Sequence, residues 1–275
     1  MIFNLPPLRE ALEAHGLLAR KSFGQHFLLD LNITRKIARL AQVGAGDLVI
    51  EVGPGPGGLT QALLETGAKV VAIEKDARFT PLLQTLMDLA GGHLSLIHAD
   101  ALFVDESQLT LGVPAHIVAN LPYNVGTPLL IKWLTGAFRP LSLTLMFQKE
   151  VAQRIVAAAG EDAYGRLAVI SQAVADAELV MDVGPRAFTP PPKVSSAVVR
   201  LVPRSVRPEP AILKALQTVT AAAFGQRRKM LRSSLKSLGG ETLCQTAGIS
   251  ADVRAETLSV AEFVDLAQAL VRQPA

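Results

Sequence analysis

Short apolar runs rich in Val and Ile alternate with amphipathic stretches of helix length through the first 150 residues of the chain. Strands that are buried on both faces read as nearly continuous apolar runs, and their alternation with helices is typical of a mainly parallel sheet covered on both sides. The pattern predicts strands at 48–52, 69–73, 94–97, 116–119 and 143–147, with helices between them at 59–65, 80–89 and 127–135.

The pattern changes after residue 147. Helices are predicted over 149–159 and 164–175, and two further strands over 178–183 and 197–202. A proline-dense loop at 185–193 separates these two strands, so we expect them to form an antiparallel pair that closes one edge of the sheet. The sheet would then have seven strands.

A polar segment with three prolines, residues 203–210, is followed by a stretch in which every pattern is helical. Segments of this composition are typical of linkers. Helices are predicted over 211–224, 227–238, 242–247 and 260–271. We therefore predict an α/β fold: a seven-stranded, mostly parallel sheet flanked by helices in a first domain of residues 1–204, followed by a small all-helical domain of residues 205–275.

Composition narrows the classes of protein that remain. The chain has 275 residues, of which 49% are hydrophobic, and a formal charge of +3, so it can build a packed core and is not disordered. A single cysteine, Cys244, excludes an intramolecular disulfide, and the five histidines lack the i, i+4 spacing of a helical metal pair. Apolar runs long enough for a membrane span or a signal peptide are absent. We expect a cytoplasmic monomer without a metal or a membrane partner.

The residues at three successive strand ends point to a nucleoside. A glycine-rich loop that includes Gly53 and Gly55 follows strand 48–52, and glycines let a ligand approach the backbone closely. Glu74 lies 21 residues after Gly53, close to the spacing of about 20 expected for a carboxylate that binds ribose hydroxyls. Asp100 follows the third strand and can accept from an adenine amino group. The three ends predict an adenosine-binding site, which both S-adenosylmethionine and NAD would fit.

The end of the fourth strand separates these two cofactors, because Asn120, Leu121, Pro122 and Tyr123 follow it. The N6 lone pair of adenine is delocalised into the ring, which makes N6 a poor nucleophile. The Asn120 amide oxygen and the Leu121 carbonyl can both accept from the amino hydrogens and draw the nitrogen toward a tetrahedral geometry. Pro122 fixes the backbone, and Tyr123 offers a stacking face worth about 1–3 kcal/mol per base. The tetrapeptide predicts methyl transfer to an extruded adenine, achieved by positioning without a strong general base.

Together these motifs resemble the ribosomal RNA adenine N6,N6-dimethyltransferases that act on small-subunit RNA, and the resemblance covers nearly the whole chain. Residues 20–28, 164–167, 188–198 and 224–229 match further motifs of that family. The resemblance implies a Rossmann-like class I methyltransferase sheet with S-adenosyl-L-methionine as cofactor. It also implies dimethylation of two adjacent adenosines near the 3′ end of 16S ribosomal RNA in the immature small ribosomal subunit.

The resemblance assigns roles to individual positions of this chain. Phe188, in the proline loop, is expected to sandwich the target base together with Tyr123, and His26 stands where several relatives have Asn. Catalytic residues are expected at Asn120, Leu121, Pro122, Tyr123 and Phe188. Cofactor contacts are expected at Gln25, His26, Leu28, Gly53, Gly55, Glu74, Lys75, Asp100, Ala101 and Asn120.

A basic run lies in the predicted helix 227–238. Arg228, Arg232 and Lys236 are spaced i, i+4 and i+8, so they would share one face, which suits a stripe of phosphate contacts but is also typical of a solvated helix face. Further positive charge stands at Arg20, Lys21, Arg204 and Arg207. RNA-binding residues are expected at Arg227, Arg228, Lys229, Arg232 and Lys236.

Three alternative functions stay open at this point. A large-subunit (23S) rRNA adenine dimethylase of the antibiotic-resistance type shares the cofactor motifs, although residues 226–229 favour the small-subunit family. A ribosome-assembly or RNA-binding factor could keep the fold without catalysis, but the intact residues 120–123 and Glu74 argue against that. A nicotinamide-dependent oxidoreductase would share the glycine-rich loop.

Overall fold

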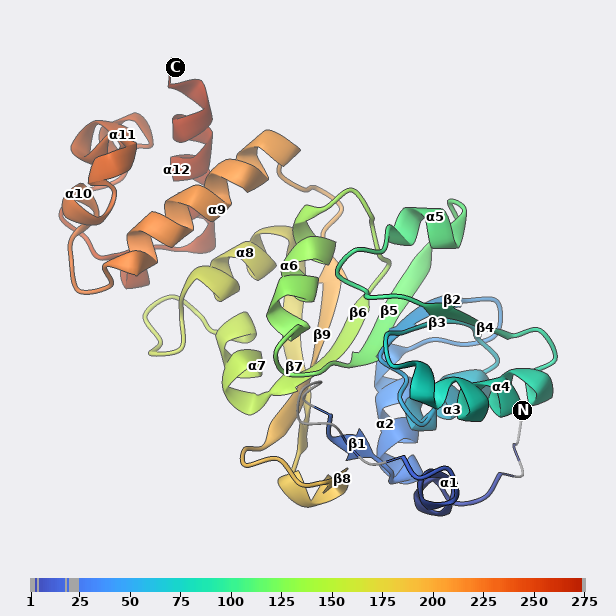
Figure 1. Cartoon of the computed structure of the whole chain (residues 1–275). Helices are drawn as coiled ribbons and strands as arrows, with labels where there is room; N and C mark the ends of the chain where they lie inside the picture. The colour runs from blue at the N-terminus through green and yellow to red at the C-terminus, as the bar shows by residue number, and fades with distance from the viewer. Residues whose placement is uncertain (1–2, 4, 18, 20–24, 274–275) are drawn as a thin grey trace. The chain divides into compact units, whose positions relative to one another are not determined.

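The computed structural model describes residues 3, 5–17, 19 and 25–273, and the chain folds into two compact units (Figure 1). The first unit holds residues 1–152 and 178–202, and the second holds residues 153–177 and 203–275. Residues 153–177 thus belong to the second unit, whereas the sequence prediction assigned them to the first domain.

A seven-stranded sheet has the strand order β4-β3-β2-β5-β6-β9-β7. Strand β2 pairs parallel with β3 and β5, β3 pairs parallel with β4, and β5 pairs parallel with β6, whereas β9 runs antiparallel to β6. The predicted mostly parallel sheet is therefore confirmed. The strands are β2 Leu48–Val52, β3 Lys69–Glu74, β4 Leu94–His98, β5 Ala115–Asn120, β6 Leu143–Gln148, β7 Ala175–Val183 and β9 Ser196–Pro203.

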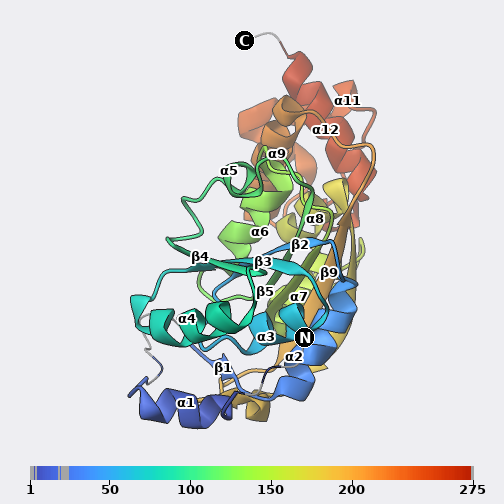
Figure 2. The same cartoon turned by 90° about the vertical axis from the view of Figure 1, so that its right-hand side faces the viewer.

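Helices of the first unit cover both faces of this sheet, which is why its central strands are apolar on both sides. Figures 1 and 2 show α2 (Leu31–Ala41), α3 (Gly58–Glu65) and α4 (Thr80–Leu89) on one face and α5 (Glu106–Thr110) and α6 (Gly126–Thr135) on the other. Val49 and Ile50 of β2 are fully buried, and so is Trp133 of α6. Helix α1 spans Leu8–Ala14, and α7 (Lys149–Val156) follows β6 directly.

A second, two-stranded sheet brings the N-terminal segment to the proline loop. Strand β1 (Phe27–Leu28) pairs antiparallel with β8 (Phe188–Thr189), which follows a 3₁₀ turn at Pro185–Ala187. Phe27 lies opposite Thr189, and Leu28 lies opposite Phe188. Two segments 160 residues apart in the sequence are thereby joined at one end of the first unit.

The second unit is helical apart from the part of β7 and β9 that it includes. Its core contains Tyr164, whose hydroxyl donates to the carbonyl of Leu258 over 2.9 Å, and Phe224, whose ring contacts Tyr164 and Phe263. Its helices are α8 Arg166–Val174, α9 Pro210–Gly225, α10 Leu231–Ser234, α11 Gly240–Thr246 and α12 Val260–Arg272, with 3₁₀ turns at Lys236–Leu238 and Ala255–Thr257.

The predicted helix 227–238 is wrong. Helix α9 ends at Gly225, and Met230 is extended (φ −69°, ψ 157°) because it forms a β-bridge with Arg254. Helix α10 begins only at Leu231, whose N–H donates to the carbonyl of Val253 over 2.9 Å. The basic run is therefore divided among a turn, a four-residue helix and a 3₁₀ turn, and does not form the single helix face that the spacing predicted.

None of the helices in the described ranges is long and apolar enough to cross a bilayer. Within the same ranges, no group of three or more His, Cys, Asp or Glu side chains is arranged to hold a metal ion.

Candidate active site

A pocket lies at the carboxyl ends of β2, β3, β4 and β5 in the first unit. The order β4-β3-β2-β5 runs outward in both directions from the gap between β2 and β5, and ligands of open α/β sheets bind at such a switch point. Gly53 follows β2, Glu74 ends β3, Asp100 follows β4 and Asn120 ends β5, and all four line this pocket. The four strand ends that the sequence singled out are therefore brought together.

The glycine-rich loop bends back toward β3 because its glycines adopt conformations that other residues rarely reach. Gly53 has φ 70° and Gly55 has φ 52°. The Gly55 N–H donates to Oε2 of Glu74 over 3.0 Å. A Cβ placed on Gly53 would lie 3.8 Å from Cδ of Pro122, so the loop also adjoins the segment after β5.

Glu74 is held as an acceptor at the end of β3. Its Oε2 accepts from Gly55 and its Oε1 accepts from the N–H of Asp76 over 2.7 Å. Two carboxylate oxygens can accept about four hydrogen bonds in all, so Glu74 keeps acceptor capacity for a ligand after these backbone contacts. Glu74 is 8% exposed, and burial raises the pKa of its carboxyl group.

The sequence prediction placed Glu51 in the glycine-rich motif but gave no role to this second buried carboxyl group of the pocket. Glu51 is 1% exposed, and its Oε2 has no hydrogen-bond partner among the described residues. Burial raises the pKa of Glu51 to about 8. A carboxyl group inside an otherwise apolar strand, directly before the glycine-rich loop, was the signal available in the sequence.

Asp100 differs from both glutamates because a cation neutralises it. Lys75 Nζ lies 2.8 Å from Oδ2 of Asp100, and the N–H of Leu102 donates to Oδ1 over 3.0 Å. The hydrogen bond from Lys75 lowers the pKa of Asp100, so this carboxylate stays ionised and can accept from an amino group. Ala101, which follows it, is buried against the same pocket.

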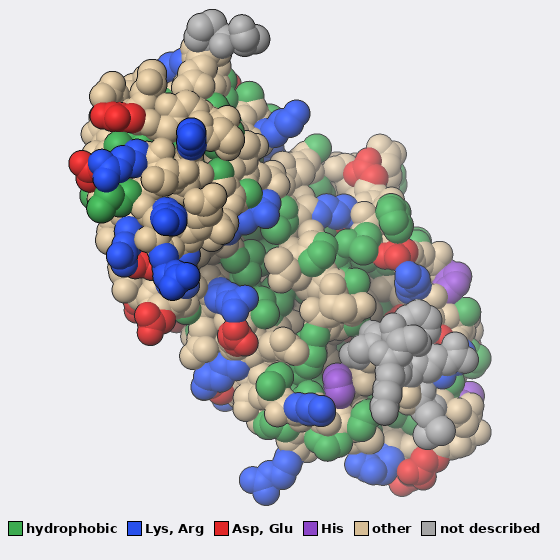
Figure 3. Space-filling model, turned by 60° about the vertical axis from the view of Figure 1, so that its left-hand side comes forward, with side chains coloured by type: hydrophobic (Ala, Val, Ile, Leu, Met, Phe, Trp, Pro, Cys, Tyr) green, Lys and Arg blue, Asp and Glu red, His purple; other side chains and the backbone are tan. Residues whose placement is uncertain are grey.

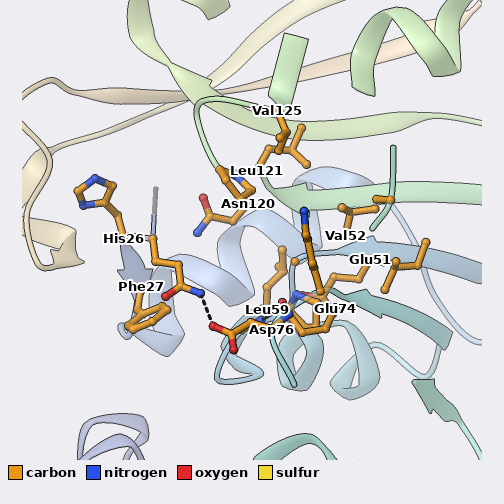
Figure 4. Close-up of a pocket in the computed structure, with 18 of the residues that line it drawn as sticks. His26, Phe27, Glu51, Val52, Leu59, Glu74, Asp76, Asn120, Leu121 and Val125 are labelled. Atoms are coloured by element: carbon orange, nitrogen blue, oxygen red, sulfur yellow. Dashed lines mark hydrogen bonds between the residues drawn. The ribbon is translucent and has the colours of Figure 1, made fainter. Parts of the chain in front are cut away.

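The N-terminal segment closes one wall of the pocket. Gln25 Nε2 donates to Oδ2 of Asp76 over 3.0 Å, shown as a dashed line in Figure 4, and Arg78 donates to the other end of the same amide. The Arg78 guanidinium lowers the pKa of Asp76 to about 2. Leu28 is buried beside this segment. The Gln25 amide is thus fixed by Asp76 and Arg78.

His26 lies beside the tyrosine of the substrate motif. Its ring stacks on Tyr123 with centroids 5.6 Å apart and an interplanar angle of 30°. Its Nδ1 donates to the carbonyl of Pro190 over 2.8 Å, which links it to the proline loop. Figure 4 shows the Asn120 side chain pointing into the space between His26 and Glu74. His26 therefore links Tyr123 to the proline loop while it lines the pocket.

The substrate motif itself is well anchored. Tyr123 Oη and Ser196 Oγ share a hydrogen bond of 2.7 Å, and burial raises the pKa of Tyr123. Leu121 and Phe188 are 2% and 3% exposed, so both are fixed by packing. The carbonyl of Pro122 accepts from the N–H groups of Val125 and Gly126, which turns the chain into α6.

The predicted catalytic and cofactor residues all line this one pocket: Gln25, His26, Leu28, Gly53, Gly55, Glu74, Lys75, Asp100, Ala101, Asn120, Leu121, Pro122, Tyr123 and Phe188. Residues 20–24 of the N-terminal motif, which include the basic pair Arg20 and Lys21 and also Gly24, lie outside the described residues. Their predicted contributions stay predictions.

A family model described as "Ribosomal RNA adenine dimethylase" matches residues 16–271. The chain belongs to this family. Among curated relatives, "Ribosomal RNA small subunit methyltransferase A" of Phenylobacterium zucineum is 73% identical over 97% of this chain and 93% of the relative. The protein of the same name from Caulobacter vibrioides is 69% identical over 92% of this chain and 97% of the relative. The family and the enzyme class predicted from the motifs are confirmed.

Two solved structures share the fold over most of the chain. A dimethyladenosine transferase from Plasmodium falciparum superposes with a TM-score of 0.73, at 25% identity over 88% of this chain and 96% of that one. The 23S rRNA methyltransferase ErmE superposes with a TM-score of 0.67, at 25% identity over 89% of this chain and 99% of that one. An enzyme named for large-subunit RNA thus shares this fold. Its sequence identity to this chain, 25%, is much lower than that of the relatives named for the small subunit.

The predicted RNA-binding residues all lie in the second unit. Arg227 pairs with Glu256 over 3.0 Å, and Arg232 pairs with Asp252 over 2.7 Å, so part of their charge is neutralised. Arg228, Lys229 and Lys236 are exposed and have no side-chain partner among the described residues. Figure 3 shows Lys and Arg side chains spread over this unit, with Asp and Glu side chains among them.

Proposed function

We propose that this chain is an S-adenosylmethionine-dependent enzyme that dimethylates N6 of two adjacent adenosines near the 3′ end of 16S ribosomal RNA. The relatives at 73% and 69% identity are named for the small ribosomal subunit, which supports this choice of RNA over the 23S RNA for which the ErmE structure is named. We further propose that the enzyme works in the cytoplasm, as a monomer, on the immature small subunit.

The residues of the pocket fit S-adenosylmethionine part by part. Glu74 offers free acceptor sites to ribose hydroxyls, and Asp100 offers an ionised carboxylate to the adenine amino group. The unpartnered Oε2 of Glu51 requires a donor, and the amino group of the methionine moiety is one. When bound, S-adenosylmethionine supplies an electrophilic methyl group on a sulfonium centre.

The observation that carries the proposal is the position of Asn120 and Tyr123 in the same pocket as Glu74 and Asp100. Accepting from the two N6 hydrogens, the Asn120 amide and the Leu121 carbonyl hold the nitrogen with its lone pair toward the donor. A nicotinamide-dependent oxidoreductase has no use for such a pair of acceptors. The geometry therefore favours attack by an aromatic amine.

Stacking positions the base for this attack. Tyr123 is fixed by Ser196 on one side and by the ring of His26, and Phe188 is buried in β8 within the same pocket. A base that leaves its helix loses stacking worth a few kcal/mol, and aromatic side chains restore about 1–3 kcal/mol of it. The N6 proton becomes acidic once the methyl group has bonded, so positioning by these residues replaces a strong base.

We assign RNA binding to the second unit. Arg228 and Lys229 belong to the family motif at 224–229, and Lys236 follows it. All three are exposed and form no ion pair among the described residues, so their charges can contact phosphate. Structured RNA is recognised chiefly through its backbone and 2′-hydroxyl groups, so few base-reading residues are needed.

Mass spectrometry of ribosomal RNA after incubation with isotopically labelled S-adenosylmethionine tests the proposal. Immature small subunits and isolated large-subunit RNA are offered separately. We expect two adjacent dimethyladenosines in small-subunit RNA only, and methylation confined to large-subunit RNA would overturn the choice of substrate. The Asn120→Ala variant should lose at least about 100-fold in rate while it still binds the RNA, as removal of an interaction made in the transition state does.

A further inference from the structure

A partly buried lysine ties α6 to the turn that follows β4. Lys132 Nζ donates to the carbonyl of Ala101 over 2.7 Å, to the carbonyl of Val104, and to Oε1 of Glu106 over 2.8 Å. Trp133, the next residue on α6, donates its Nε1 to the same oxygen of Glu106 over 2.6 Å. An ammonium group has three N–H donors, and all three are used here.

This arrangement is not a surface ion pair. The side chain of Glu106 is 2% exposed and that of Lys132 is 26% exposed, so both charges are largely removed from water. Desolvation makes such a pair no better for stability than apolar residues of the same size. Its value lies in the geometry that it imposes, because the two main-chain carbonyls can be held only if the ammonium is fixed in place.

What the lysine holds is the adenine end of the pocket. Residues 100–105 form a tight turn, in which Asp100 accepts from the N–H groups of Leu102 and, through its carbonyl, of Phe103. The largest side chain of this turn does not anchor it by packing, because Phe103 is 87% exposed. Ala101, whose carbonyl Lys132 binds, lines the pocket next to Asp100. The polar contacts with Lys132 therefore hold the turn from which the Asp100 carboxylate projects toward Lys75.

Helix α6 also anchors the substrate motif at its other end. The N–H groups of Val125 and Gly126 donate to the carbonyl of Pro122 over 3.1 Å and 3.2 Å. Lys132 lies on the same helix fewer than two turns later. One rigid element thus sets both the turn that carries Asp100 and the segment that receives the target base.

We propose that Lys132, held by Glu106, is a positioning residue that places Asp100 to accept from the adenine amino group of the methyl donor and so sets the selectivity of the donor site for adenine. The inference rests on the proposed function, since it assumes that Asp100 reads the adenine of S-adenosylmethionine. It goes beyond it in assigning selectivity to a residue that does not line the pocket.

Calorimetric titration with two ligands tests the proposal. One is S-adenosylhomocysteine, and the other is its analogue with purine in place of adenine, which lacks only the 6-amino group. In the wild-type protein, a hydrogen bond to a charged acceptor should make the Kd of S-adenosylhomocysteine roughly 10- to 100-fold lower than that of the purine analogue. In Lys132→Met we expect this ratio to fall to within about 3-fold, because the turn that carries Asp100 loses its contacts to α6 and its carboxylate no longer meets the amino group in a good geometry. The Kd of the purine analogue should change little.

Two further variants serve as controls for folding and for the loss of a lysine charge. Lys132→Met combined with Glu106→Gln leaves no unpaired buried charge and keeps an acceptor for Trp133, so it should fold and show the same loss of selectivity. Lys149→Met removes a lysine of the same unit that pairs with Asp182 on the surface, and it should keep the wild-type ratio.

The outcomes separate the inference from the function on which it rests. Failure of the wild-type protein to bind S-adenosylhomocysteine would remove the proposed function. Binding of both ligands with an unchanged ratio in the Lys132 variants, or an equal loss for both ligands, would overturn the inference alone. Failure of the double variant to fold would also overturn it, by making Lys132 a residue of the core.

Discussion

Replacing Glu51 with Gln removes one ionisable group from the donor pocket while it keeps the size and shape of the side chain. The pKa of Glu51 is about 8, so at pH 7 about 90% of the ligand-free molecules carry a protonated Glu51. A cationic amino group at the unpartnered Oε2 favours the carboxylate form. Binding of the donor or its product should therefore release about 0.9 proton at pH 7 and about 0.1 proton at pH 9.

The number of protons follows from calorimetric titration of S-adenosylhomocysteine in buffers of different ionisation enthalpy. The slope of the observed enthalpy against the buffer's ionisation enthalpy should be near −0.9 in the wild-type protein, because the buffer takes up the released proton, and near zero in Glu51→Gln, by the linkage of proton and ligand binding. Glu65→Gln is the matched control, because Arg35 lowers the pKa of Glu65, which is ionised before and after binding. Equal slopes in the wild-type protein and in Glu51→Gln would refute the assignment of Glu51.

The same group links stability to pH with a definite sign. The folded pKa of Glu51, about 8, lies above its ordinary value of 4.5, so the folded protein retains a proton that the unfolded chain gives up. The contribution of Glu51 to the free energy of unfolding is complete below pH 4.5 and is lost as the pH rises to 8, at about 1.4 kcal/mol per pH unit, or about 5 kcal/mol in all. In urea unfolding, the free energy of unfolding of Glu51→Gln relative to that of the wild-type protein should be higher at pH 8 than at pH 5.

Three other substitutions have expected outcomes. Glu74→Ala should raise the KM for S-adenosylmethionine at least about 10-fold by removing a charged acceptor, as initial rates over donor concentration will show, and an unchanged KM would take Glu74 out of the site. Tyr164→Phe should lower the free energy of unfolding by about 1–2 kcal/mol in urea titrations, because a buried carbonyl loses its donor. Arg228→Gln with Lys229→Gln should weaken RNA binding and reduce its salt slope by up to about 2, and a wild-type slope would return both residues to the solvated surface.

The sheet was predictable because each central strand is buried on both faces. The strand 48–52 has the bounds that the apolar run gives, and the strands at 94–97 and 143–147 extend by one residue in the structure. Residues at the carboxyl ends of parallel strands meet at one edge, so predicting the strands also brought Glu74, Asp100 and Asn120 together. For these residues, the main-chain topology alone determines proximity.

The parts that failed depend on contacts distant in the sequence. The run 227–238 has a helical pattern, but Met230 and Leu231 exchange helical hydrogen bonds for pairing with Arg254 and Val253, which no local pattern records. Strands β1 and β8 have two residues each, too few to show a period of two. The roles of Glu51 and Lys132 were missed for the same reason. Glu51 acquires its role from burial, and Lys132 acquires its role from three acceptors that lie 26 to 31 residues away in the sequence.

The four carboxyl groups of the pocket show why residue type alone does not give the chemistry. Asp100 and Asp76 are neutralised by a lysine and an arginine, so they remain ionised without adding net charge. Within the part of the chain that the structure describes, Glu74 and Glu51 form no ion pair, and burial raises the pKa of both. The negative charge that is available to a ligand therefore comes from these two groups, and Glu51 acquires its share only when a cation arrives. A sulfonium gains from that charge, whereas the neutral thioether left after methyl transfer does not, so the pocket should bind the donor more tightly than a neutral analogue of equal shape as the pH rises toward 8.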